Sequence, residues 1–252
     1  MGNKATRKNE YSIRPIPLIQ IRQPKPMFTY LMNWGQRVTA CSGLWFIEGP
    51  QTKILIDTGR ASLVSAFPQV EVEPIQPLED GLGKFGLEPA DIELIILTHL
   101  HYDHVELAHK YPRAKFIVQK AELDFALNPR GVMAGTVYKK ELFDGLNFEV
   151  IEGDNKIISG VEVFLTPGHT PGGQSVGIQT KEGLAVITGF CCIHENFEPP
   201  EQLKGTMPII TPGIHMNVCE LDESMLRVKQ IGNIIVPVHD ADFFQKDSIP
   251  GD

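Results

Sequence analysis

The sequence predicts an α/β protein in which β-sheets are packed between layers of helices. Strand-like segments come first along the chain, and the later ones alternate with helical segments, an order that favours sheets covered by helices. The 252 residues are 42% hydrophobic and 21% charged, which is typical of a soluble globular chain with a sizeable core. We expect a single domain over residues 11–252, after a disordered lead-in over residues 1–10.

The first half of the chain is divided by prolines, glycines and short apolar runs. Residues 11–40 contain four prolines and no clear period, which indicates short strands and loops. Apolar segments at 44–47 and 53–56 flank a Gly-Pro turn and predict a hairpin. Further on we expect an irregular stretch over 60–77, a short helix over 78–85, a buried strand over 92–97 and a helix over 105–111 that Pro112 ends.

The second half alternates strands with helices. We expect strands over 115–119, 148–151, 161–166, 174–179, 184–188 and 233–238, helices over 121–127 and 222–231, and a proline-rich loop over 195–220. Gly232 directly follows the last of these helices, as a helix-ending glycine does.

Four of the expected strands end at side chains that can bind or support a metal ion. The strand over 53–56 leads to Asp57, that over 92–97 to His99, that over 161–166 to His169, and the last to His239. Since a rigid sheet positions the loops at its edge around one crevice, these side chains are expected to meet there.

The strongest single motif is Thr98-His-Leu-His-Tyr-Asp-His104, with three histidines and an aspartate in seven residues. In an extended loop, His99, His101 and Asp103 lie on one side because the period is two, and His104 follows as a helix begins. His99 and His101 then suit one metal, whereas Asp103 and His104 suit a second. Imidazole and carboxylate together favour zinc, and iron or manganese also fit.

Two isolated histidines complete the expected ligand sets. His169 lies in a Gly/Pro turn and is expected to be the third ligand of the first metal. His239 follows the last strand and is expected to be the last ligand of the second. Either histidine alone would more often be structural, and the preceding motif favours the ligand interpretation. We interpret Asp57 as a support that orients a ligand histidine.

These motifs resemble those of the metallo-β-lactamase superfamily. The pattern HxHxDH stands here at residues 99–104, and the stretch Leu-Ile-Asp-Thr-Gly at 55–59 is typical of the same superfamily. Within it the chain is most similar to the N-acyl homoserine lactonases, through residues 98–104, 151–154, 166–172, 195–198 and 239–240. The resemblance implies a four-layer αββα sandwich and a hydrolase that attacks its substrate with metal-bound hydroxide.

The sequence departs from that family at one metal-bridging position. The aspartate that bridges both metals in the family falls on Gly189 or Phe190, depending on the alignment, and a substrate-binding tyrosine falls on Cys192. Either Cys191 or Cys192 replaces the bridge as a thiolate, or the second metal is weak or absent and the site works with one ion. A third interpretation is that both cysteines are simply packed in the core.

The expected reaction is hydrolysis of a small cyclic substrate. Hydroxide on the metal attacks the carbonyl carbon of a lactone of the N-acyl homoserine lactone type, and Asp103 carries a proton to the leaving group. The segments 27–34 and 197–217 are expected to wall the pocket. The alternatives are a hydrolase of another cyclic ester, amide or thioester, and an iron redox protein of the same fold.

Composition excludes several other classes. The formal net charge of −8 argues against nucleic-acid binding, and no apolar run approaches the length of a membrane helix. Four irregularly spaced cysteines do not form a disulfide scaffold, so reduced thiols and a cytoplasmic location are expected. The expected partner is a small-molecule cyclic ester or amide substrate, and a homodimer is the expected form of any self-association.

Overall fold

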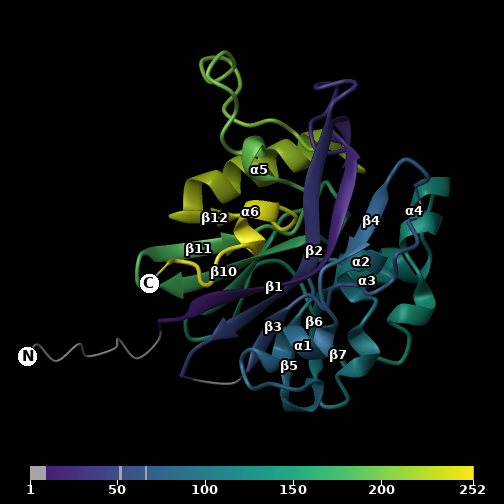
Figure 1. Cartoon of the computed structure of the whole chain (residues 1–252), viewed down its shortest axis with the longest axis vertical. Helices are drawn as coiled ribbons and strands as arrows, with labels where there is room; N and C mark the ends of the chain where they lie inside the picture. The colour runs from purple at the N-terminus through teal and green to yellow at the C-terminus, as the bar shows by residue number, and fades with distance from the viewer. Residues whose placement is uncertain (1–9, 51–52, 66, 252) are drawn as a thin grey trace, which may run out of the picture.

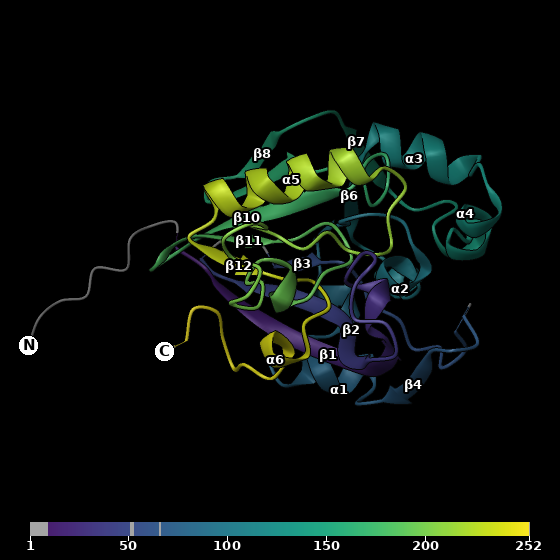
Figure 2. The same cartoon turned by 90° about the horizontal axis from the view of Figure 1, so that it is seen from above.

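Two β-sheets lie face to face between layers of helices, as Figures 1 and 2 show. The computed structural model describes residues 10–50, 53–65 and 67–251. Residues 1–9, which make up almost all of the expected disordered lead-in, lie outside the described residues. The expected αββα sandwich is confirmed.

The first sheet has seven strands, antiparallel on one side and parallel on the other. Its antiparallel part includes the predicted hairpin, in which Trp45 pairs with Ile56. In spatial order the strands are β4 (Glu71–Pro74), β1 (Ser12–Pro24), β2 (Arg37–Glu48), β3 (Ile54–Ile56), β5 (Leu94–Ile96), β6 (Lys115–Gln119) and β7 (Phe148–Ile151).

The second sheet has five strands and ends in a parallel pair. Its strands in spatial order are β12 (Ile234–Val236), β11 (Gly183–Ile187), β10 (Gln174–Thr180), β9 (Val161–Leu165) and β8 (Asn155–Ile158). Only β11 and β12 run parallel. His239 lies just beyond the end of β12. Because β12 runs parallel to β11, His239 is at the same edge of the sheet as the end of β11.

The helices are short, apart from one. They are α1 (Leu78–Gly83), α2 (Tyr102–Val105), α3 (Lys120–Leu127), α4 (Val132–Val137), α5 (Val218–Ile231) and α6 (Ala241–Phe244), with single 3₁₀ turns at Lys25–Met27, Pro89–Asp91, Ala108–Lys110, Lys140–Leu142 and His194–Asn196. Figure 2 shows α5 along the outer face of the second sheet and α1 on the opposite side of the sandwich. No helix among the described residues is both long and apolar enough to cross a membrane.

Three apolar clusters separate the four layers. The cluster between the sheets includes Trp45, Ile56 and Val176, all fully buried. Leu55 points the other way, into the cluster under α1 to α4. Burial on both faces explains why β3 is a continuous run of aliphatic residues rather than an alternating strand. A third cluster, with Met225 of α5, fills the outer face of the second sheet.

The expectation of short strands and loops over residues 11–40 is wrong for β1, which is a single strand of 13 residues. Its Ile13 uses its backbone N–H and C=O to bond Ile249, on the side away from β2. Pro15 and Pro17 follow at spacings of two, so their missing N–H groups would also point away from β2. The prolines therefore remove no bond of the β1–β2 ladder.

Two predicted helices have different limits in the structure. The helix expected over 105–111 is replaced by α2 and a separate 3₁₀ turn, because Val105, Ala108 and Tyr111 are buried at a spacing of three, which suits a 3₁₀ repeat. Helix α5 begins four residues earlier than expected, because the Asn217 side chain accepts hydrogen bonds from the first backbone N–H groups.

Four short elements have no counterpart among the expected elements. Strand β4 lies inside the stretch expected to be irregular, and β8, α4 and α6 are also additional. Each has only four to six residues, which is too short for a hydrophobic period to be recognised. Strand β2 begins at Arg37, seven residues before the expected start at residue 44. The other predicted strands and helices are present within a few residues of their expected limits.

Candidate metal centre

Chain segments from both sheets meet at one edge of the sandwich. Asp57 directly follows β3, and the segment from His99 to His104 follows β5 and enters α2. From the second sheet, His169 lies in the loop between β9 and β10, and His239 follows β12. The expected convergence of strand ends is thus observed, and it joins residues that lie up to 182 positions apart, from Asp57 to His239.

Three histidines form the first of two ligand-type sets. The candidate ligand atoms of His99, His101 and His169 all lie within 4.8 Å of one another. Nε2 of His99 and Nε2 of His169 are 3.2 Å apart. All three side chains are buried. This is the grouping that the sequence predicts for the first metal.

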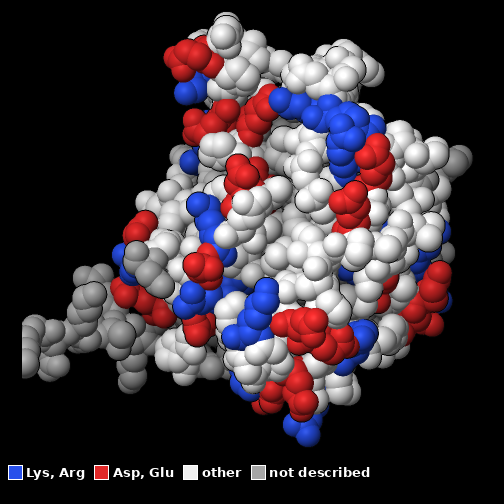
Figure 3. Space-filling view, in the orientation of Figure 1, with Lys and Arg blue, Asp and Glu red and all other residues white. Residues whose placement is uncertain are grey.

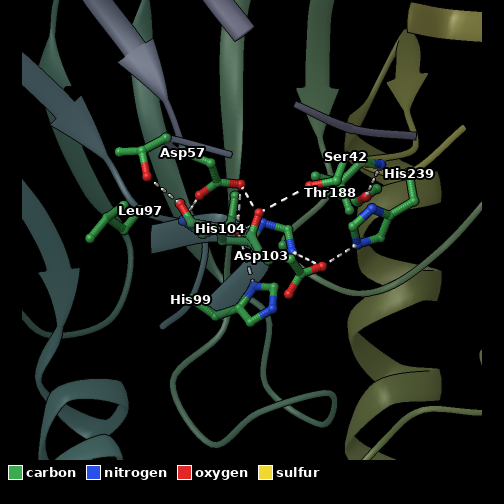
Figure 4. A network of polar contacts seen from close by, with 12 residues as sticks. Ser42, Asp57, Leu97, His99, Asp103, His104, Thr188 and His239 are labelled. Atoms are coloured by element: carbon green, nitrogen blue, oxygen red, sulfur yellow. Dashed lines mark hydrogen bonds and ion pairs between the residues drawn. The ribbon is translucent and has the colours of Figure 1, made fainter. Parts of the chain in front are cut away.

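The second set combines Asp103, His104 and His239, whose candidate ligand atoms also lie within 4.8 Å of one another. One carboxylate oxygen of Asp103 is 3.7 Å from Nε2 of His104 and 3.8 Å from Nε2 of His239. Figure 4 shows the Asp103 carboxylate between the two imidazole rings. The grouping agrees with the prediction, but Asp103 lies in α2 rather than in an extended loop, so its position results from the start of the helix.

The other ring nitrogen of several histidines is fixed by a neighbouring oxygen atom. Nδ1 of His169 is 2.7 Å from the Ile214 carbonyl oxygen, and Nδ1 of His239 is 3.0 Å from that of Cys41. A carbonyl can only accept, so Nδ1 carries the proton in both rings. Nε2 is therefore left with a lone pair that faces its set, as a metal-ligating histidine requires.

Asp57 fixes His104 in the same manner. Its Oδ2 lies 2.7 Å from Nδ1 of His104, and its carboxylate also accepts hydrogen bonds from the backbone and hydroxyl of Thr98 (Figure 4). Asp57 is buried and has a backbone φ of +59°, an uncommon conformation that aspartate adopts more readily than most residues. The support that we inferred for Asp57 is therefore present in the structure.

The net pKa shift favours the neutral imidazole in four of the five histidines of the site. It lowers the pKa of His99 and His101 well below the ordinary value, and lowers that of His169 to about 4, with the neighbouring imidazoles adding to the effect. Burial also lowers the pKa of His239. In His104 burial acts in the same direction, but the Asp103 and Asp57 carboxylates outweigh it and raise the pKa. Neutral imidazole is the form that binds a metal.

The donor set fits divalent metal ions. Nε2 of His101 and Nε2 of His104 are buried and have no hydrogen-bond partner among the described residues. A buried polar atom without a partner is costly, and a metal ion at each set would use both lone pairs. The carboxylate of Asp103 is available as an anion, because although burial raises its pKa, His104 and His239 outweigh that effect and lower it.

Glu122 ties the two ligand-bearing loops together, a role that sequence reasoning missed. Its carboxylate is fully buried and accepts hydrogen bonds from the backbone of Leu100 at 2.9 Å and of Gly172 at 3.2 Å, and from the Tyr138 hydroxyl at 2.9 Å. It therefore joins the His99–His104 segment to the His169 turn. A single glutamate near the start of a helix carries no sequence signal for this role.

The adjacent cysteines lie in different surroundings. Cys192 packs in the cluster under α5, with its Sγ 3.1 Å from Oγ1 of Thr188. Cys191 instead lines the pocket that contains the histidines, although its thiol belongs to neither ligand-type set. A side chain cannot be accommodated at Gly189, because its Cβ would lie 2.0 Å from the Gln174 carbonyl oxygen. The geometry thus favours packing for Cys192 and leaves Cys191 as the only one of the pair beside the site.

The five histidines of the two sets and Asp103 line one pocket. Met27, Phe28 and Ile214 come from the two segments expected to wall it, whereas Trp34 lines a separate depression. The free space is about 70 Å³, which is far below the roughly 300–1,000 Å³ of pockets that enclose a drug-sized ligand. In this conformation the pocket suits a single small ring.

Comparisons with known proteins agree with this geometry. The family model of the metallo-beta-lactamase superfamily matches residues 44–189. N-acyl homoserine lactonase AiiA from Bacillus thuringiensis subsp. kurstaki is 31% identical over 178 residues, which cover 65% of this chain and 69% of the relative. N-acyl homoserine lactonase AttM from Agrobacterium fabrum is 29% identical over 150 residues, or 52% of this chain and 57% of AttM.

Solved structures show the same architecture. A structure of N-acyl homoserine lactone hydrolase with the product N-hexanoyl-L-homoserine bound at its catalytic metal centre superposes with a TM-score of 0.72 and 26% identity, covering 93% of this chain and 94% of that chain. A probable metal-dependent hydrolase from Staphylococcus aureus has a TM-score of 0.71 at 16% identity over 93% of this chain and 91% of its own, which shows the shared fold.

Proposed function

The chain belongs to the metallo-beta-lactamase superfamily and is a hydrolase of that superfamily, and we propose that it opens a lactone of the N-acyl homoserine lactone class. Two ligand-type sets that share one small pocket carry this proposal. The relatives that are named N-acyl homoserine lactonases, and the product-bound structure of one such hydrolase, support the substrate class.

We propose that His99, His101 and His169 hold one metal ion, and that Asp103, His104 and His239 hold a second. Zinc is the ion we expect, because imidazole with carboxylate suits it best, and iron or manganese are the alternatives. Bound there, a divalent ion would lower the pKa of a water molecule to near neutrality and polarise the ester carbonyl. Cys191 is the remaining candidate for the position of the missing bridging aspartate.

The residues of the chain then divide the remaining work. Asp103 is held as an anion between two imidazoles, so it can accept a proton from the attacking water and return it to the alkoxide that leaves the opened ring. Met27, Phe28 and Ile214 provide an apolar wall that excludes bulk water from the ester. Asp57 keeps the His104 ring oriented while this occurs.

Ring opening releases one proton for each lactone, so a pH-indicator assay tests the proposal directly. Purified protein that is loaded with zinc is expected to open an N-acyl homoserine lactone, and chelator-treated protein is expected to be inactive until metal is restored. His101→Ala should abolish activity and lower the bound metal content, whereas His109→Ala, at an exposed position outside the pocket, should change neither. Failure of the loaded protein on every acyl homoserine lactone would reject this substrate class.

A hydrolase of another cyclic ester, amide or thioester is the second candidate. It is favoured by Cys192, which stands where the lactonases have a substrate-binding tyrosine and is packed under α5 instead of facing the pocket. A panel of lactones, lactams and thiolactones, assayed with the same zinc-loaded protein, separates this candidate from the first. An iron redox protein would instead require iron for activity and would consume oxygen.

We also propose that residues 11–252 act as one domain in the cytoplasm. Cys41, Cys191, Cys192 and Cys219 are free thiols in the structure, which suits a reducing compartment. Localisation of a tagged chain tests the compartment. Light scattering of the purified chain tests whether it forms a homodimer.

A further inference from the structure

A buried arginine lies beside the ligand-type sets without a carboxylate partner. Arg60 is 1% exposed and lines the pocket that contains the histidines. Its guanidinium donates to the carbonyl oxygens of Ser62 at 2.9 Å and Val64 at 3.4 Å, and to the Tyr102 hydroxyl at 3.0 Å. Among the described residues, no aspartate or glutamate oxygen forms an ion pair with it within 4.0 Å.

The arrangement is unusual for an arginine of this chain. Arg14, Arg22, Arg37 and Arg227 each pair with a carboxylate, and all four are more exposed than Arg60. A buried charge without an opposite charge is costly, whereas a surface charge is stabilised by water. Arg60 is the one buried arginine among the described residues, so it needs a counter-charge most, and it has none within ion-pair distance.

Neighbouring carboxylates are engaged elsewhere. Glu106 accepts hydrogen bonds from the backbone N–H groups of Ala61 and Ser62, at 3.2 and 2.8 Å. Asp103 faces the imidazoles of His104 and His239 and forms no ion pair with Arg60 within 4.0 Å, although the guanidinium is near enough to help lower the pKa of its carboxyl. Any metal ion at the two sets would add positive charge to the same pocket.

The hydrogen bonds of Arg60 do not use all of its donors. A guanidinium has five N–H donors, and the three hydrogen bonds of Arg60 use three of them, all to neutral acceptors. Arg60 contacts Tyr102, which lies between the candidate ligands His101 and Asp103 in the sequence. Figure 3 shows acidic and basic side chains intermixed over one face of the molecule. That face therefore carries no extended positive patch among its described residues. The positive charge of Arg60 is local to the pocket.

We propose that Arg60 binds a carboxylate on the substrate, so that the preferred substrate is a lactone whose acyl substituent is acidic. This inference rests on the proposed lactonase function and specifies its substrate. Arginine pairs with a carboxylate through charge-assisted hydrogen bonds, which are stronger than bonds to neutral acceptors. Arg60 lines the same pocket as the two ligand-type sets, so a carboxylate that it binds would lie beside them.

A pair of lactones that differ only in charge tests the inference. Homoserine lactone acylated with succinate is anionic, and its methyl ester is neutral. With the zinc-loaded full chain, we expect kcat/KM to be at least about tenfold higher for the acid, since a hydrogen bond between two charged groups is stronger than one to a neutral acceptor. In Arg60→Met the ratio of the two kcat/KM values should fall toward one. Arg60→Lys should retain part of the preference, because it keeps the charge without the planar donor pair.

Arg22→Met is the matched control, because Arg22 is an exposed arginine of β1 that pairs with Glu71 and does not line the pocket. It should leave the ratio unchanged. Metal content and thermal unfolding of each variant show whether it is folded. If Arg60→Met fails to fold, the wild-type ratio and competitive inhibition by succinate, compared with succinamide, still decide the question.

The outcomes distinguish the two proposals. Equal kcat/KM for the acid and the ester overturns the role of Arg60 and leaves the lactonase function intact. An equal loss on both substrates in Arg60→Met also overturns it, and identifies Arg60 as a structural residue of the Ser62–Val64 loop. If neither lactone is opened, the proposed function fails, and calorimetric binding of succinate to wild type but not to Arg60→Met then decides the role of Arg60 alone.

Discussion

At the residue scale, the site depends on which nitrogen of each imidazole carries the proton. Asp57 accepts from Nδ1 of His104, whereas backbone carbonyls accept from Nδ1 of His169 and His239. Each contact places a proton on Nδ1, so the neutral ring keeps the lone pair of Nε2 for its set. The orienting partners therefore contribute to metal binding together with the ligands.

Asp57→Asn should weaken the second metal site while leaving the fold intact. The asparagine oxygen can still accept from the Thr98 backbone, and asparagine tolerates the positive φ. Its amide would donate to Nδ1 of His104, which moves the ring proton to Nε2 and removes the lone pair. We expect the affinity for one of two metal ions to fall about 10–100-fold, measured by chelator competition. Asp124→Asn, at an exposed residue paired with Lys120, is the control, and equal affinities in the two variants would contradict the prediction.

Glu122→Ala should destabilise the protein strongly. It removes the acceptor of the Leu100 and Gly172 N–H groups, and each buried donor left without a partner costs about 1–3 kcal/mol. We expect the free energy of unfolding in urea to fall by about 3 kcal/mol or more. Tyr138→Phe, which removes only one bond to the same carboxylate, should cost less. Glu149→Ala at the surface is the control, and a similar effect of Glu122→Ala and Glu149→Ala would show that the carboxylate is not needed.

The two adjacent cysteines are expected to respond differently to substitution. Cys192→Ala should retain the full metal content, because Cys192 packs against Thr188 under α5, and should lower stability by creating a small cavity. Cys191→Ala should lower occupancy of the second site if the thiolate replaces the missing aspartate. Metal content measured by elemental analysis compares them. Loss of metal in Cys192→Ala contradicts the packing interpretation, and unchanged content in both variants ends the thiolate hypothesis.

At the element scale, helix α5 and the residues just before it hold the turn that carries His169 through hydrogen bonds. The carbonyl of Gly168 accepts from the backbone N–H groups of Met216 and Asn217, just before α5, and the Ser224 hydroxyl donates to the Pro167 carbonyl. Gly168 has φ +119°, and a Cβ there would lie 2.3 Å from the backbone nitrogen of Leu221. The glycine is therefore required by both its conformation and the close approach of the helix.

Gly168→Ala should displace the His169 turn from α5 and impair the first ligand set more than the second. We expect lower metal content and lower thermal stability. Comparison with a His169→Ala variant assigns the lost metal to the set of His99, His101 and His169. Gly205→Ala is the control, because a Cβ added there would have no atom within 4 Å among the described residues and its loop is exposed. Wild-type metal content and stability in Gly168→Ala would contradict this account of the turn.

The sequence predicts the elements that have a strong local pattern. The β2–β3 hairpin, β6, α3 and the two ligand groupings follow from apolar runs, turn residues and the histidine spacing. The 13-residue length of β1 could not be predicted, because the tolerance of Pro15 and Pro17 depends on which side of the strand pairs with β2. Long-range partners such as Glu122 and Arg60 are likewise set by the folded sandwich and leave no pattern along the chain.

At the scale of the whole molecule, the two ligand-type sets connect the two halves of the sandwich. His99, His101, Asp103 and His104 follow the first sheet, whereas His169 and His239 follow the second. A metal that binds only the folded chain stabilises it by mass action, by about 2.7 kcal/mol at a free concentration 100 times its dissociation constant. The same sets should make the metal-free protein sensitive to acid.

The stability of the chelator-treated protein is expected to fall as the pH is lowered from about 7 toward 4. Burial lowers the pKa of His169 to about 4, below the value of about 6.5 in an unfolded chain. Between these values the unfolded state binds the proton more readily, so the stabilising contribution is fully present above pH 6.5 and lost on acidification. His99, His101 and His239 act in the same direction. His104 acts in the opposite direction, because Asp103 and Asp57 raise its pKa despite its burial.

Urea unfolding of the metal-free protein at a series of pH values measures this dependence. His169 alone is expected to contribute up to about 3 kcal/mol of the decrease, at 1.36 kcal/mol for each pKa unit. His169→Gln should therefore flatten the pH profile between 6.5 and 4, whereas His109→Gln, at an exposed position, should leave it unchanged. In acid, the histidines that follow the two sheets would become charged while packed against each other. This repulsion should weaken the contact between the two sheets at the ligand-type sets. A profile that is flat for wild type over this range would show that the buried histidines do not remain neutral.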